Sequence, residues 1–212
     1  MQQERLVRSR TLYRNGTVWR GTVAPFIAIA SLLGILAALP LEAQQGGARE
    51  PRIAPLESAE GINIMRTLAN HPALAEAWLP FAGYILRQNS LPPHDRELLI
   101  LRIAVLCGAD YEWGHHTRMA KEAGVTEAEI QQVLKGPNAE GWGSFGRALM
   151  RAADELHRDA TISDRTWAYL DARYDEKQLM DVVFTVGQYN MVSMALNSFR
   201  VPMDEGLEGI PK

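Results

Sequence analysis

The fold and the chemistry of this chain are concentrated in one stretch, which runs from Glu97-Leu98-Leu99-Ile100-Leu101-Arg102 into Ala109-Asp110-Tyr111-Glu112-Trp113-Gly114-His115-His116. Its first part is an apolar segment, and its second part is rich in acids, aromatic rings and imidazoles. Carboxylates, a phenol and an imidazole that lie close together on neighbouring helices can transfer protons. We therefore take four residues of this stretch as candidate catalytic residues: Glu97, Tyr111, Glu112 and His116.

Apolar residues recur at helical spacing over most of the remaining chain, which predicts an all-α fold. We expect helices over residues 59–68, 73–89, 93–107, 110–123, 126–134, 144–157, 163–173 and 176–199, with a loop over 136–143. The helix over 93–107 is apolar nearly all round, so it should be central. The long last helix is interrupted by polar residues, which favours a buried core helix over a membrane span. No alternating strand pattern or phosphate-binding glycine loop competes with this interpretation.

Local signals support several of these boundaries. Pro93 suits the first turn of a helix, because its missing N–H has no partner there in any case. Gly124 is a good C-terminal cap. Thr126-Glu127-Ala128-Glu129 is a capping-box pattern, and Ser144 and Ser163 are candidate N-caps.

Composition limits the classes of function. With 212 residues and 47% hydrophobic content, the chain can bury one good core. Residues 1–43 hold five arginines and two glutamates, so 17 basic and 23 acidic residues remain downstream. An acidic body without a Lys/Arg stripe argues against binding to nucleic acid. The single cysteine, Cys107, excludes an internal disulfide, and its apolar surroundings favour a buried, inert thiol.

The N-terminal residues have the order of a targeting segment. Arginines precede an apolar run over residues 23–39, and Leu41-Glu42-Ala43 offers a small residue at a cleavage point. We therefore predict a signal peptide and linker over residues 1–47 and a single helical domain over 48–212. The expected location is exported, periplasmic or secreted. The alternative is an uncleaved segment that anchors the protein to a membrane, because the run is close to the lower limit for a span.

The chain resembles the carboxymuconolactone decarboxylase and alkylhydroperoxidase D superfamily over about residues 75–200. In the peroxidase branch, a relay glutamate precedes a Cys-X-X-Cys motif, and a histidine follows four residues after the second cysteine. These positions fall on Glu97, Ala109, Glu112 and His116, and a further relay position falls on Tyr111. The continuation from Ala120 to Ile130 is also similar. The resemblance implies an alkylhydroperoxidase D-like helical bundle, with a helical hairpin core and a long C-terminal helix.

The chain departs from the peroxidase branch at both cysteine positions. A disulfide cycle needs one thiolate that attacks the peroxide and a second thiol that resolves the product. Ala109 and Glu112 provide neither, so thiol peroxidase activity is not expected. The Tyr-Glu-Trp-X-X-His form resembles the cysteine-free members of the superfamily that are named decarboxylases.

The leading interpretation is therefore an enzyme, a cofactor-independent lyase that acts on a small carboxylated or lactone-like substrate. We assign proton transfer to His116, its orientation to Glu97 or Glu112, and an oxyanion contact to Tyr111. His115 is expected to point elsewhere, to the surface or an interface. Two alternatives are an alkylhydroperoxidase-like oxidoreductase and a non-catalytic helical binding protein. No cofactor is expected, and a divalent metal held by Glu97, Glu112 and His116 is a minor alternative.

The resemblance also implies a homo-oligomer, which is a dimer, trimer or hexamer in this family. Residues 78–84 and the last helix offer more apolar surface than one body of this size is expected to hide. The tail over residues 201–212 has Pro and Gly punctuation, and we expect it to lie over a neighbouring subunit. Apart from the N-terminal segment, no membrane contact is expected.

Overall fold

A computed structural model describes residues 50–212, and all regular structure within them is helical. The elements are α1 (Asn63–Leu68), α2 (Pro72–Arg87), α3 (Pro93–Cys107), α4 (Asp110–Glu122), α5 (Glu127–Lys135), the short 3₁₀ helix η1 (Gly136–Asn138), α6 (Ser144–Asp159), α7 (Asp164–Asp171) and α8 (Glu176–Phe199). The predicted all-α class is confirmed. The predicted targeting segment lies outside the described residues.

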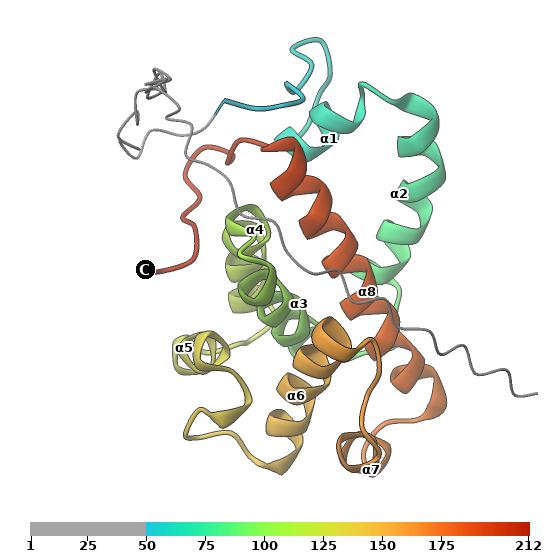
Figure 1. The fold of residues 1–212 in the computed structure, drawn as a ribbon, viewed down its shortest axis with the longest axis vertical. Helices are drawn as coiled ribbons and strands as arrows, with labels where there is room; N and C mark the ends of the chain where they lie inside the picture. Colours follow the sequence, from blue (N-terminus) through green and yellow to red (C-terminus); the bar gives the residue numbers. More distant parts are fainter. Residues whose placement is uncertain (1–49) are drawn as a thin grey trace, which may run out of the picture. The chain divides into compact units, whose positions relative to one another are not determined.

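Helix α3 is the centre of the bundle, as its sequence predicts (Figure 1). It packs against α4, α5, α6 and α8, and its residues Leu99, Ile100, Leu101 and Ile103 are fully buried. Gly108 ends the helix in the left-handed conformation, with φ of 58°. A residue without Cβ adopts this conformation at little cost. The chain therefore reverses directly into α4, and the two helices form a hairpin.

The cap signals are confirmed in part. Thr126 and Glu129 form the predicted capping box at the start of α5, and the Ser163 hydroxyl accepts from the Thr166 amide. The amide of Val125, just after Gly124, donates back to the Ala120 carbonyl, which closes the end of α4. The prediction for Ser144 is wrong. Gly143 is the N-cap, and no side chain caps this helix.

Other differences from the predicted boundaries are small. Helix α1 begins at Asn63 rather than at residue 59, because the preceding residues form turns. The loop predicted over 136–143 contains the 3₁₀ helix η1. Both ends of α3 and both ends of α8 lie where the sequence places them.

Helices α2 and α8 pack against each other (Figure 1). Together they carry one apolar face that no other helix of residues 50–212 covers. We call this the α2/α8 face, and its large exposed apolar residues are Leu74, Phe81, Tyr84, Met180, Val183, Phe184, Met191 and Met194. Ile85 of α2 is fully buried. Among residues 50–212, no helix combines the length and the apolarity needed to cross a bilayer.

Candidate active site

Glu97 and His116 meet between α3 and α4. Glu97 lies one turn into α3 and is only 1% exposed, while His116 lies on the side of α4 that faces α3. Nδ1 of His116 is 2.7 Å from Oε2 of Glu97. The hairpin therefore creates a buried contact between an acid and an imidazole, as the sequence predicts.

Glu112 occupies the other side of the same imidazole. It lies one helical turn before His116 on α4, so the two side chains share a helix face. Nε2 of His116 is 3.3 Å from Oε2 of Glu112. Each ring nitrogen thus faces a different carboxylate, and we call these three residues the Glu–His–Glu cluster.

The cluster favours a protonated imidazole. Burial by itself lowers the pKa of His116, but hydrogen bonds to Glu112 and Glu97 outweigh it and raise the pKa to about 9. At neutral pH the ring is therefore an imidazolium that donates to Glu97 and forms an ion pair with Glu112. Arg96 lies 3.3 Å from the second oxygen of Glu97, so two positive groups accompany two negative groups.

Tyr189 of α8 closes the third side of the cluster. Its ring meets the His116 ring edge to face, with centroids 4.8 Å apart and planes at 87°. Burial and the nearby charges of Glu112 and Glu97 raise the pKa of Tyr189 well above its ordinary value. We did not predict Arg96 or Tyr189 as site residues. The available signal for Tyr189 was the polar interruption of an otherwise apolar helix.

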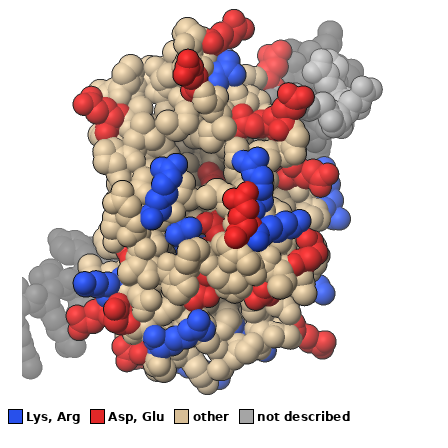
Figure 2. Space-filling model, turned by 180° about the vertical axis from the view of Figure 1, so that it is seen from behind, with Lys and Arg blue, Asp and Glu red and all other residues tan. Residues whose placement is uncertain are grey.

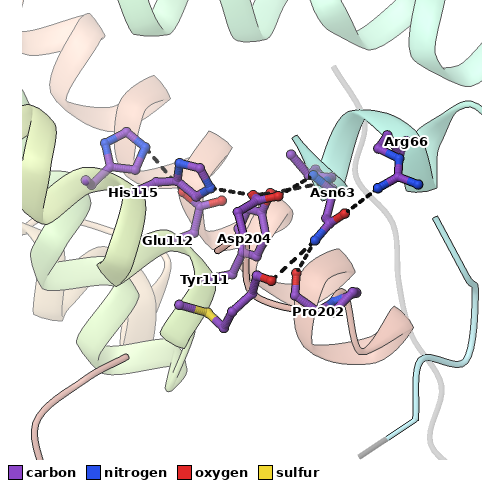
Figure 3. A network of polar contacts seen from close by, with 10 residues as sticks. Asn63, Arg66, Tyr111, Glu112, His115, Pro202 and Asp204 are labelled. Carbon is purple, nitrogen blue, oxygen red and sulfur yellow. Dashed lines mark hydrogen bonds and ion pairs between the residues drawn. The ribbon is translucent and has the colours of Figure 1, made fainter. Parts of the chain in front are cut away.

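Tyr111 lies next to this cluster but is bonded elsewhere. Its hydroxyl donates to the Asp204 carboxylate and accepts from the Ile64 amide at 3.1 Å (Figure 3). Burial and the bond to Asp204 raise the pKa of Tyr111 well above its ordinary value. The geometry therefore gives no support to the oxyanion contact that we assigned to this residue.

Asp204 connects the C-terminal tail to α1 and α4. It also accepts from the Asn63 amide at 2.9 Å and lies 2.8 Å from Nε2 of His115 (Figure 3). One expectation is thereby corrected, because the His115 side chain is largely buried rather than at the surface. The tail packs on α1 and α4 of its own chain, and its contact with a neighbouring subunit stays a prediction. No local pattern in the sequence pointed to Asp204.

Gly114 explains how the tail comes so close to α4. A Cβ at this position would lie 2.9 Å from the Glu208 carbonyl oxygen and 2.9 Å from the Met203 methyl group. Farther along, the Ile210 amide donates to Asp110 at 3.0 Å. The tail therefore covers the first half of α4, the helix that carries Glu112 and His116.

The residues that could hold a metal do not surround one point. The two nitrogens of His116 point in opposite directions, so Glu97 and Glu112 lie on opposite sides of the ring. Within residues 50–212, no group of three or more His, Cys, Asp or Glu side chains is arranged around a common position.

Cys107 is not part of the Glu–His–Glu cluster. It is half-buried at the end of α3 and bonded to polar groups, which corrects the expectation of a buried thiol in apolar surroundings.

An apolar groove of about 160 Å³ lies between α1, α2 and α8. Its wall includes Ile64, whose amide is bonded to Tyr111, and Val192, which lies one turn along α8 from Tyr189.

On the molecular face in Figure 2, acidic and basic side chains are interspersed, and no continuous basic stripe crosses it.

Comparison with known proteins agrees with the resemblance inferred from the sequence. Residues 72–155 match the sequence model of the Carboxymuconolactone decarboxylase family. No match was found among the curated proteins.

Several solved structures share the fold. A debrominase, Bmp8, solved as a C82A variant with 2,3,4-tribromopyrrole, is 14% identical with a TM-score of 0.64, and the match covers 75% of this chain and 95% of that one. An uncharacterized peroxidase-related protein from Ralstonia eutropha JMP134, with an alkylhydroperoxidase AhpD core, is 13% identical with a TM-score of 0.61, covering 68% and 77%. A protein of unknown function from Agrobacterium tumefaciens is 17% identical with a TM-score of 0.60, covering 65% and 94%. The superfamily and the alkylhydroperoxidase D-like fold are confirmed.

Proposed function

Because residues 72–155 match the carboxymuconolactone decarboxylase family within an alkylhydroperoxidase D-like fold, we propose that this protein is a cofactor-independent lyase. Its substrate is a small carboxylated or lactone-like compound. His116 supplies the proton that replaces carbon dioxide on the substrate carbon. The match itself fixes the family only, and the reaction is argued below from the residues.

The single observation that carries this proposal is the buried imidazole of His116, which lies 2.7 Å from Glu97 on one side and 3.3 Å from Glu112 on the other. A general acid is effective when it holds its proton at the working pH and can release it to the reacting atom. With its pKa raised to about 9, His116 holds a proton at neutral pH. No metal or organic cofactor is required for such a transfer.

The two sides of the imidazole suit different roles. Glu97 is the more deeply buried acid and makes the shorter contact, at 2.7 Å to Nδ1, so it orients the ring. The contact from Nε2 to Glu112 is longer, at 3.3 Å, and the Glu112 side chain is 9% exposed. Nε2 is therefore the end that exchanges its proton with a substrate or with solvent.

The reaction balances without another reactant. The substrate carboxylate leaves as carbon dioxide, and the electron pair of the broken C–C bond is delocalised into a conjugated carbonyl. Nε2 of His116 then protonates the carbon, and a proton from solvent restores the imidazolium through Glu112. The apolar groove between α1, α2 and α8, whose wall includes Ile64, suits the uncharged part of a small molecule.

A thiol peroxidase mechanism suits this chain less well. A disulfide cycle needs two thiols, and the sequence contains one cysteine. A non-catalytic binding protein is the remaining alternative. The buried charges disfavour it, because such groups are costly to bury without a function.

The test uses carboxymuconolactone as the probe, and it measures both carbon dioxide release and loss of the probe. Glu97→Gln and His116→Gln should each lower turnover by about a hundredfold or more, the usual scale for a general acid or its partner. Glu122→Gln removes an exposed acid at the end of α4 and should leave turnover unchanged. Turnover of His116→Gln within about threefold of the wild type would remove the residue from the mechanism. If the wild type does not turn over carboxymuconolactone, a panel of small carboxylated lactones and a thiol-dependent peroxide assay distinguish the alternatives.

We also propose that copies of the chain associate through the α2/α8 face. Eight large apolar side chains are exposed on this face, including Phe184 and the three methionines of α8. Monomeric proteins rarely expose an apolar patch of this extent, and a second copy would cover it.

A further inference from the structure

A second group of polar side chains lies at the opposite end of α3 from Glu97. Cys107 is the last residue of α3, His157 is in the last turn of α6, and Asn190 is on α8. Oδ1 of Asn190 is 3.2 Å from Sγ of Cys107 and 2.8 Å from Nδ1 of His157, and the sulfur and the nitrogen are 3.8 Å apart. Three helices thus bring a sulfur, a nitrogen and an oxygen together.

The three atoms are all capable of binding a metal. In the free protein, the Asn190 oxygen accepts from the Cys107 thiol and from Nδ1–H of His157. The thiol of Cys107 can lose its hydrogen as a proton. The hydrogen on Nδ1 of His157 can move to Nε2 by a change of tautomer. The arrangement does not suit a cysteine nucleophile with a histidine base, because Asn190 binds the same nitrogen that faces the sulfur.

Ser193 of α8 is a second, independent observation beside this group. Its side chain is fully buried, yet its hydroxyl has no hydrogen-bond partner among residues 50–212. A buried hydroxyl without a partner is unusual in a folded protein, and this one is available to donate to the sulfur when a metal ion replaces the thiol proton.

We propose that Cys107, His157 and Asn190 form a binding site for a thiophilic divalent metal ion such as Zn²⁺. The side chain of His157 is exposed and Cys107 is half-buried, so an ion can enter from solvent. Asn197 donates to the Cys107 carbonyl at 2.8 Å, which fixes the backbone behind the sulfur. The site is separate from the Glu–His–Glu cluster and does not depend on the proposed reaction.

The observed spacing is close to that of a zinc site. With Zn–S of about 2.3 Å and Zn–N and Zn–O of about 2.0–2.2 Å, neighbouring tetrahedral ligands lie about 3.4–3.6 Å apart. The three distances here are 3.8, 3.2 and 2.8 Å, so Asn190 needs to move outward by about half an ångström to reach that spacing. Water takes the fourth position.

The experiment titrates reduced, metal-free, full-length protein with Co²⁺ and then displaces it with Zn²⁺. We expect one ion per chain and a sulfur-to-cobalt charge-transfer band. The band should disappear in Cys107→Ser, and the affinity should fall by about tenfold or more in His157→Gln. His71→Asn, which removes an exposed imidazole from the start of α2 and supplies another capping side chain, should bind as the wild type does.

A cobalt complex without the charge-transfer band, or with unchanged affinity in Cys107→Ser, would overturn the proposal. A second measurement needs no variant. Zn²⁺ should slow the alkylation of Cys107 by iodoacetamide in the wild-type protein by about tenfold or more, because a bound thiolate is no longer free to react. Alkylation at the same rate with and without Zn²⁺ would also overturn it.

Discussion

The imidazole of His116 lies 2.7 Å from the carboxylate of Glu97, although the two residues are 19 positions apart and belong to different helices. Packing of α4 on α3 fixes this pair, and Glu112 completes it from within α4. The chemistry that we propose depends on this buried contact.

The pair predicts how stability changes with pH. The pKa of His116 is raised to about 9 in the folded protein, from about 6.5 in an unfolded chain. Between these values the folded state binds more protons, so the free energy of unfolding should fall as pH rises from about 6.5 to 9. The stabilisation is complete below the lower value and lost above the higher one. Urea titrations across this range should give a clearly smaller slope for His116→Gln, and equal slopes in the two proteins would refute the assignment.

The contact of the tail with Gly114 predicts a loss of stability when a side chain is added. In Gly114→Val the new side chain would meet the Glu208 carbonyl, which is backbone and cannot rotate away. We expect a loss of about 1–3 kcal/mol in the free energy of unfolding, the usual cost of overpacking.

The matched control is Gly83→Ala in α2, where a Cβ meets nothing within 4 Å. It should be neutral or stabilising, because alanine favours a helix over glycine by about 1 kcal/mol. Urea denaturation measures both variants. If Gly114→Val is as stable as the wild type, the tail does not pack on α4 as described.

The α2/α8 face predicts self-association. In light scattering after gel filtration, the wild type should have at least twice the mass of one chain. Phe184→Glu, which places a charge in the middle of this face, should shift the protein toward the monomer. Trp167→Glu changes an aromatic residue that is 41% exposed on α7, outside the face, and should not alter the mass. A monomeric wild type would contradict the prediction.

The N-terminal sequence predicts export, with cleavage near Ala43. Mass spectrometry of the mature protein from cell fractions should find chains that begin close to this residue outside the cytoplasm. Full-length chains in the membrane fraction would indicate the anchored alternative. Full-length chains in the cytoplasm would contradict both.

The predictable parts of this fold are those with local causes. The boundaries of α3 follow from Pro93, a continuous apolar segment and Gly108, and the capping box of α5 follows from four adjacent residues. The contact between Glu97 and His116 was predictable because the pattern shared with the family places both residues on adjoining helices.

The parts that sequence reasoning missed depend on tertiary contacts. Asp204 lies in a tail with no periodic pattern, and only its return to α4 makes it a partner of Tyr111 and His115. The neighbours of Cys107 come from α6 and α8, more than 45 positions away. Apolar residues next to Cys107 in the sequence therefore did not reveal its polar surroundings.

The most direct test of the central claim is a titration of the His116 imidazole by NMR in selectively labelled protein. The Glu–His–Glu cluster predicts a pKa near 9, which should move back toward its ordinary value in Glu97→Gln. A pKa at or below about 6.5 in the wild type would mean that His116 is neutral at physiological pH, and it would contradict the proposed role as the proton donor.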